Sequence, residues 1–214
     1  MDKVKSSMGK IGKYLREISV VVIGVAITLS ASYWITSRSE KKDLALYLEA
    51  IKMELEENIR ALNVINQHVI QPAVKYSVYL SSQDKKALNA DSLRYYMYET
   101  VNKATSITIK TNAFEMFKSS GKMRLVDQKE LLLSIWDTYT ILGREKQIFD
   151  QMAEMKTEEV KKYLFQYSNR PSDADLLNNP PLWEIYVNMP LSYVQEESYK
   201  RAIASLTETL SKFK

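Results

Sequence analysis

Twenty consecutive residues near the start of the chain, Ile18 to Ser37, contain no Asp, Glu, Lys, Arg or His. At a rise of about 1.5 Å per residue, an α-helix of this length covers about 30 Å, the thickness of the hydrocarbon core of a bilayer. Every face of such a helix is apolar, and little else in a chain of 214 residues could surround it. The stretch therefore predicts a transmembrane helix over residues 18–37.

Aromatic side chains stand at both ends of this stretch. Tyr14 precedes it, and Tyr33 and Trp34 lie near its end. Amphipathic rings favour the headgroup layer, so these three residues are expected to form an interface belt. A cleavable signal peptide is the alternative, because the preceding tail is basic and residues 30–32 are small. The uncharged stretch is longer than a signal core of about 7–15 residues, which favours the membrane helix.

The flanking charges predict an orientation for this helix. The first 37 residues carry five basic and two acidic side chains, which accounts for three of the four net positive charges of the chain. Arg38, Lys41, Lys42 and Lys52 follow the helix, so the excess of cations on the N-terminal side is small. Because cytoplasmic flanks are richer in Lys and Arg, residues 1–17 are expected in the cytoplasm. The basic pI of about 9.0 thus reflects a juxtamembrane tail and does not indicate nucleic-acid binding.

Small residues recur along the predicted membrane helix. Gly24, Thr28 and Ser32 are four residues apart and share one face. Such stripes allow two lipid-embedded helices to approach closely, which predicts contact with a second copy or with another membrane protein. The alternative is that small residues are simply common in membrane helices.

A long helix is predicted to continue beyond the lipid. No glycine or proline occurs between Gly24 and Pro72, so nothing obliges the helix to end before residue 71. Apolar residues there alternate at spacings of four and three, a heptad seam with Asn58 as its polar member. The seam either forms a coiled coil whose register Asn58 fixes, or packs on helices of the same chain, which the many apolar residues downstream favour. Pro72 is expected to break or kink this rod. The seam comprises Leu44, Leu48, Ile51, Leu55, Asn58, Leu62, Ile65 and Val69.

The rest of the chain is expected to form a bundle of about five helices that packs on the rod. The chain has only five glycines and five prolines, which disfavours β-sheet folds with their frequent turns. Gly121 is expected at a left-handed helix end, and Asp127 with Glu130 is expected to cap the following long helix. Periodicity predicts helices at 73–80, 92–109, 111–120, 127–167 and 191–213, with fraying near 156–157 and an irregular stretch at 169–181.

The predicted fold class is therefore all-α, with a single N-terminal transmembrane helix. Its segments are a basic tail (1–17), the membrane helix (18–37), the rod (38–71) and the helical bundle (72–214).

The residues needed for several kinds of chemistry are missing. The chain has no cysteine and one histidine, His68, which removes thiol catalysis, disulfides and the usual zinc and di-iron sites. Residues 118–123 resemble a phosphate-binding loop, but Met116 and Met123 stand where that loop needs its first glycine and its magnesium-binding hydroxyl. Acidic residues such as Glu54 are interpreted as parts of solvated faces. We therefore expect no catalytic, cofactor or metal site, and no enzyme activity.

Fourteen tyrosines are the other unusual feature, and several cluster, including Tyr76 with Tyr79 and Tyr95 with Tyr96. Tyrosine suits protein interfaces and polar-rimmed pockets, although at helical spacing it also serves in core packing. The leading hypothesis is a membrane-anchored scaffold that contacts the lipid bilayer and either a second copy or another membrane-associated protein. The alternative is a sensor in which a tyrosine-lined pocket binds a small molecule and shifts the rod.

Two segments resemble one protein family. Residues Arg16 to Leu29, closing at Tyr33-Trp34, resemble the anchor of an uncharacterised family of bacterial single-pass membrane proteins. Residues Phe114 to Asp127 resemble the central segment of the same family, so the resemblance covers about residues 13–145. It implies a short tail, one inner-membrane helix and an α-helical domain of unknown function, with no catalytic residue assigned. With the orientation above, that domain is expected in the periplasm.

Overall fold

The computed structural model describes residues 2–82, 92, 95, 96, 99, 106–166 and 191–213. These residues include helices and no strand, and the predicted all-α class with a long apolar N-terminal helix is confirmed. The elements are, in chain order, α1 (Asp2–Ile65), the π-helical turn η1 (Asn66–Ile70), α2 (Gln71–Ser82), α4 (Asn112–Ser119), the 3₁₀ turn η4 (Lys122–Leu125), α5 (Lys129–Gln166) and α8 (Leu191–Ser211).

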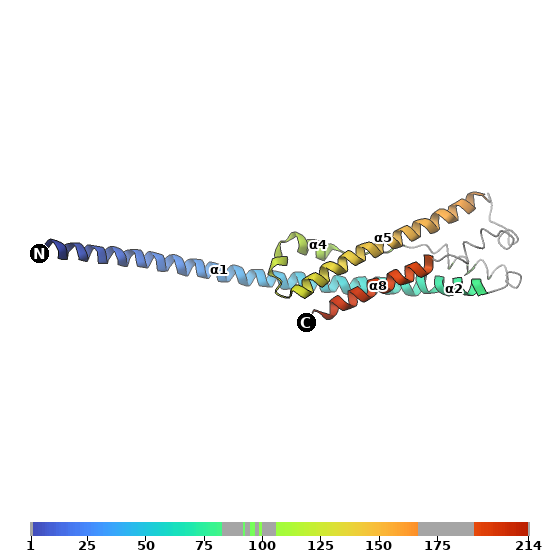
Figure 1. The fold of residues 1–214 in the computed structure, drawn as a ribbon, viewed down its shortest axis with the longest axis horizontal. Helices are drawn as coiled ribbons and strands as arrows, with labels where there is room; N and C mark the ends of the chain where they lie inside the picture. The colour runs from blue at the N-terminus through green and yellow to red at the C-terminus, as the bar shows by residue number, and fades with distance from the viewer. Residues whose placement is uncertain are drawn as a thin grey trace.

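Helix α1 leads directly from the apolar segment into the bundle. Its N-terminal part projects alone, while its C-terminal part lies beside α4, η4 and α8 (Figure 1). The large apolar side chains between Ile18 and Ile35 are 53–76% exposed. The helix is long and apolar enough to span a membrane.

The rod does not end at Pro72. The five residues Asn66–Ile70 form a π-helical turn, and the chain continues as α2 to Ser82. In an α-helix the proline ring collides with the carbonyl four residues before it, and proline offers no N–H to the ladder. The wider π turn relieves both conflicts, so the helical path continues past the proline. Pro72 therefore does not break the helical path, and the local change that accompanies it is the π-helical turn.

The heptad seam of α1 packs inside the molecule. Ile51, Leu55 and Leu62 are at most 1% exposed, and Asn58 is equally buried. The flanking seam residues Leu44, Leu48 and Ile65 are partly buried against the same core, and Val69 is half-buried. The core residues opposite the seam come from α4, α5 and α8 of the same chain. This face of α1 is therefore occupied within the protomer.

Two polar residues of α1 bind the backbone of a distant segment. The Asn58 side chain donates to the Lys110 carbonyl (2.9 Å) and accepts from the Lys110 N–H (2.8 Å). The Glu54 carboxylate accepts from the N–H groups of Ala113 (2.8 Å) and Phe114 (3.3 Å). These N–H groups belong to the first turn of α4, where they lack partners within the helix and the helix dipole favours negative charge. Glu54 is only 6% exposed, so its assignment to a solvated face is wrong.

Tyr139 of α5 completes this junction. Its hydroxyl donates to Glu54 at 2.5 Å, and its ring stacks on Phe114 with 4.2 Å between the centroids. Burial, together with the neighbouring carboxylate, raises the pKa of Tyr139 far above its usual value, so the hydroxyl remains a donor. A single carboxylate of α1 thus positions both α4 and α5.

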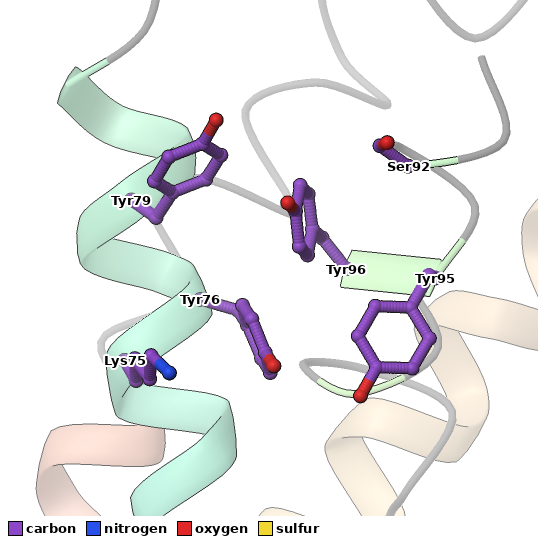
Figure 2. A pocket seen from close by; sticks show the side chains of 6 residues that line it. All are labelled: Lys75, Tyr76, Tyr79, Ser92, Tyr95 and Tyr96. Atoms are coloured by element: carbon purple, nitrogen blue, oxygen red, sulfur yellow. The ribbon is translucent and has the colours of Figure 1, made fainter. Parts of the chain in front are cut away.

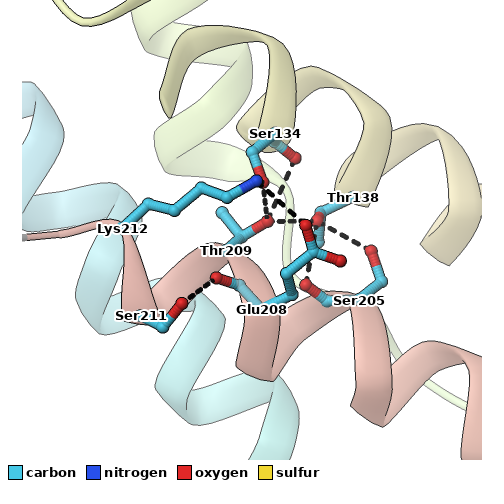
Figure 3. A network of polar contacts seen from close by, with 7 residues as sticks. All are labelled: Ser134, Thr138, Ser205, Glu208, Thr209, Ser211 and Lys212. Atoms are coloured by element: carbon cyan, nitrogen blue, oxygen red, sulfur yellow. Dashed lines mark hydrogen bonds and ion pairs between the residues drawn. The ribbon is translucent and has the colours of Figure 1, made fainter. Parts of the chain in front are cut away.

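Helices α5 and α8 are joined by hydroxyl groups near the C-terminus (Figure 3). Ser134 and Thr209 approach to 2.6 Å, Thr209 and Thr138 to 2.7 Å, and Thr138 and Ser205 to 2.8 Å. Each hydroxyl can donate and accept, so the row forms a connected set of hydrogen bonds. Lys212 donates to Ser134 Oγ at 3.1 Å and closes the end of the row.

Glu145 forms the second polar link between α5 and α8. Arg201 binds both carboxylate oxygens, at 3.0 and 2.9 Å, and Ser198 donates at 2.6 Å. Arg144 also donates, at 2.8 and 3.1 Å. Burial alone would raise the pKa of Glu145, but the hydrogen bonds from Arg201, Ser198 and Arg144 outweigh it and lower the pKa to about 2. The carboxylate is therefore ionised at neutral pH.

Several predicted helix limits can be compared with the structure. Gly121 adopts the expected left-handed conformation after α4, with φ of 68°. The Gln128 carbonyl accepts the first hydrogen bond of α5, so Gln128 and not Asp127 is the N-cap residue. Residues 106–111 are not helical, so the helix predicted over 92–109 does not reach its expected end. Helix α5 runs without fraying through residues 156–157, and α8 ends at Ser211.

The helix predicted over 92–109 falls partly outside the described residues, and the irregular stretch at 169–181 falls wholly outside them. The described residues do not confirm a bundle of about five helices. What they show is one continuous rod, formed by α1, η1 and α2, which packs with two long helices, α5 and α8, and with the short α4. From here on, the rod means these three elements.

Replacing a seam leucine tests this packing. Leu55→Ala is expected to lower the free energy of unfolding by about 2–5 kcal/mol, because it leaves a cavity in the core. Leu133→Ala, at a site 63% exposed on α5, should change it by less than about 0.5 kcal/mol. Denaturant unfolding of the full chain in detergent, followed by circular dichroism, measures both. Equal effects would mean that the seam is not core.

Candidate functional site

A pocket with a volume of about 590 Å³ lies at the end of the rod remote from the apolar segment. Residues three and four positions apart share a helix face, which turns one side of α2 toward the pocket. The volume is in the range of small-molecule sites. The described residues that line it are Lys75, Tyr76 and Tyr79 of α2, with Ser92, Tyr95 and Tyr96 opposite them (Figure 2).

The four tyrosine rings of the pocket touch one another. Tyr96 stacks on Tyr76 with 5.0 Å between the centroids and meets Tyr79 edge-on, also at 5.0 Å. Tyr95 meets Tyr76 edge-on at 5.6 Å. Offset and edge-on contacts are the favoured geometries of aromatic pairs. The rings therefore join α2 to the segment that carries Tyr95 and Tyr96.

The hydroxyl groups of Tyr95 and Tyr96 remain protonated at neutral pH. A hydrogen bond with Tyr76 raises the pKa of Tyr95, and the nearby Glu99 carboxylate raises it further. Burial raises the pKa of Tyr96, with Tyr79 adding to the effect. Lys75 Nζ lies 5.4 Å from the centre of the Tyr76 ring, a cation–π distance. The described lining thus offers flat apolar faces, hydroxyl groups and a cation, which suits binding of a flat molecule with a polar or anionic group.

A buried lysine lies between α5 and α8. Lys156 is fully buried, and its Nζ donates to Gln195 Oε1 at 3.2 Å. Burial lowers the pKa of Lys156 to about 8. Gln195 Nε2 and Ser77 Oγ are also buried and have no hydrogen-bond partner within the part of the chain that the structure describes. This end of the bundle therefore contains more polar groups than the described residues satisfy.

Sequence reasoning missed Glu54, Glu145 and Lys156 as buried groups. The signal for two of them was present, because Glu145 and Lys156 stand four residues before and seven residues after the buried Phe149. Those spacings place all three side chains on the core face of α5. A charged residue within an apolar stripe predicts a buried partner, and Arg201 is the partner that the sequence did not identify.

The residues predicted to pack membrane helices lie on the projecting part of α1. Thr28 Oγ1 donates to the Gly24 carbonyl at 2.9 Å, so its hydroxyl is satisfied within its own helix. A Cβ atom at Gly24 would meet nothing within 4 Å, so this face is open at Gly24. Ser32 is exposed on the same helix.

The predicted interface belt lies partly within the described side chains. Tyr33 and Trp34 are 76% and 63% exposed, and the Arg38 guanidinium lies 5.6 Å from the centre of the Trp34 ring. The side chain of Tyr14 is outside the described residues. His68 is exposed in η1. Among the described residues, no group of three or more His, Asp and Glu side chains could hold a metal ion.

The chain matches no protein-family model, no curated protein and no solved structure. The resemblance of residues 16–29 and 114–127 to a family of bacterial single-pass membrane proteins therefore stays a prediction.

The buried lysine gives a pH-dependent test. Since the folded pKa of about 8 lies below the ordinary value of 10.5, the unfolded chain binds more protons between these values, and stability should rise with pH across that interval. Lys156→Met is expected to remove this rise and to stabilise the protein at pH 7 by about 1–3 kcal/mol, because no charge remains to be buried. Lys129→Met, at an exposed site, should neither remove the rise with pH nor stabilise the protein at pH 7. Urea unfolding at several pH values measures both variants; an unchanged alkaline rise in Lys156→Met would contradict this assignment.

Proposed function

We propose that this protein is a non-enzymatic, membrane-anchored helical scaffold that holds its bundle beside the lipid and acts through protein–protein contacts. The observation that carries the proposal is the continuity of α1, a helix of 64 residues. Its first part is apolar and exposed, and its last part supplies the buried seam of the core. No linker separates the two parts. A partner bound to the bundle is therefore held at a set distance from the membrane.

The location is a bacterial inner membrane, with residues 1–17 in the cytoplasm and the bundle in the periplasm. The excess of cations before Ile18 supports this orientation. The resemblance to bacterial single-pass proteins supports the location.

The outer face of α1 supplies a contact surface. Leu46, Met53 and Val64 are 63%, 56% and 56% exposed on the side away from the seam. Successive residues of an α-helix are rotated by about 100° around its axis. By this count each of the three side chains points within about 40° of the direction in which Gly24 faces. The small residues of the membrane segment and the exposed apolar residues of the rod thus form one stripe, which we call the outer stripe. A partner along this stripe needs a helix that continues from lipid into water, and a second copy of the chain provides one.

Disulfide cross-linking in native membranes tests this contact, since the chain has no cysteine of its own. Leu46→Cys is expected to give a dimer on oxidation, because the same residue of the second copy lies opposite it. Ala45→Cys is the matched control: it is also exposed, but it points about 100° away. Adding Gly24→Ile to Leu46→Cys should reduce the dimer by separating the membrane helices, since the added side chain meets nothing within the protomer. Equal cross-linking at positions 45 and 46 would exclude the outer stripe as the interface.

The tyrosine pocket favours a second candidate, a sensor of a small molecule. The pocket is built on α2, which continues the same rod that enters the membrane segment. A ligand that binds one position of the rod more tightly than another shifts the population between them.

A thermal-shift screen of flat aromatic and anionic compounds tests this candidate. A ligand of the pocket is expected to raise the melting temperature of the full chain and to lose most of that effect in Tyr96→Ala, which removes the central ring. Tyr193→Ala, at an exposed tyrosine of α8, should keep the shift. A shift that persists in Tyr96→Ala would place the ligand elsewhere.

A further inference from the structure

The corner between α4 and α5 is bound to α1 at the point where the uncharged stretch ends. Lys122 Nζ lies 3.5 Å from Glu40 Oε1 and 3.7 Å from Asp43 Oδ2. The Arg124 guanidinium lies 3.6 Å from Glu40. Ser37, the last residue of the uncharged stretch, is half-buried, whereas residues 33–36 are exposed. The packed part of the molecule therefore begins where the apolar segment stops.

The position of this corner follows from helix geometry. Glu40 is three residues beyond Ser37, which is about 5 Å along a helix axis. The headgroup layer adds about 5–7 Å on each side of the hydrocarbon core. If residues 18–37 fill that core, as the proposed anchorage requires, then Glu40 and the η4 turn bound to it lie at the height of the headgroups. The unbroken helix leaves no linker that would move them away.

Cations surround α1 at this height. Arg38, Lys41 and Lys42 are exposed on α1, and the Arg124 side chain is 75% exposed on η4. On a helix, residues two apart are about 160° from each other, so Arg38 and Lys42 lie on the side of α1 away from Glu40. Arg124 lies on the Glu40 side. We call these four residues the basic collar.

The neighbours of the basic collar fit an interfacial position. Lys122 and Arg124 approach Glu40, and Lys122 also approaches Asp43. These two cations offset the two carboxylates, so the charges of the three basic-collar residues on α1 are not cancelled. Met123 lies between these two cations and packs against the core. Arg38 lies over the ring of Trp34, a residue type enriched where lipid meets water.

We propose that the basic collar binds the phosphate groups of anionic phospholipids, and that this contact holds the bundle upright on the membrane surface. Guanidinium groups match phosphate oxygens with paired hydrogen bonds, and lysine adds attraction to an anionic surface. The proposal rests on the membrane anchorage proposed above and adds to it a second, electrostatic attachment by the bundle itself.

Single cysteines in the full chain allow the contact to be measured. Ser119→Cys lies next to the η4 corner, and Ser82→Cys lies at the far end of α2. Each is labelled with a fluorophore in vesicles of phosphatidylcholine, with or without phosphatidylglycerol, that contain headgroup-spin-labelled lipid as quencher. We expect quenching at position 119 and not at 82, with stronger quenching when phosphatidylglycerol is present.

Variants of the basic collar give the decisive comparison. Arg124→Gln and, separately, the pair Lys41→Gln and Lys42→Gln are expected to remove the phosphatidylglycerol-dependent part of the quenching at position 119. Lys110→Gln, at an exposed lysine paired with Glu57 higher on the rod, should leave it unchanged. Circular dichroism confirms that each variant is folded. The double variant at Lys41 and Lys42 leaves Arg124 in place, so its result does not depend on any structural role of Arg124.

The outcomes separate this inference from the anchorage. A chain that leaves the vesicles in carbonate contradicts the anchorage itself. A chain that stays in the vesicles, but shows equal quenching at 119 and 82 or no dependence on phosphatidylglycerol, overturns the headgroup contact alone. Inorganic phosphate added to phosphatidylcholine vesicles should not reproduce the effect; if it does, the collar binds free anions and the lipid proposal is overturned.

Discussion

The buried face of α1 is the surface on which the other packed elements rest. Its apolar seam supplies Ile51, Leu55 and Leu62 to the core, and the two polar residues beside them determine where α4 and α5 sit. Glu54 binds the first turn of α4 and the hydroxyl of Tyr139, while Asn58 binds the backbone at Lys110. Buried polar groups are costly unless they are paired, so these contacts admit one placement of the partner segment, whereas apolar contacts alone would tolerate several.

The same principle organises the contact between α5 and α8. A row of hydroxyl groups lies near the C-terminus, and the Glu145–Arg201 pair lies farther along the helices. Hydrogen bonds of this kind add modest stability but require a particular register between the helices. Glu145 is paired with a cation, whereas the buried Lys156 has only a neutral amide as its described partner. Burial therefore lowers the pKa of Lys156.

The proposed functions all depend on the continuity of the rod. The apolar segment, the seam, the outer stripe and one wall of the tyrosine pocket are carried by α1, η1 and α2 without a loop between them. The π turn before Pro72 preserves this path. A scaffold uses such a rod to keep its partner at a set height, and a sensor would use it to carry a displacement toward the membrane.

The sequence by itself determined the apolar segment, the long uninterrupted helix, the left-handed Gly121 and the seam of α1, because each follows from local composition or periodicity. It did not show that Glu54, Glu145 and Lys156 are buried, nor that a π-helical turn precedes Pro72. Charged side chains are normally solvated, and only the arrival of Tyr139, Arg201 and Gln195 from distant segments makes their burial tolerable. The tertiary structure decided these positions because the partners of a buried polar group are set by packing between helices, which no local pattern encodes.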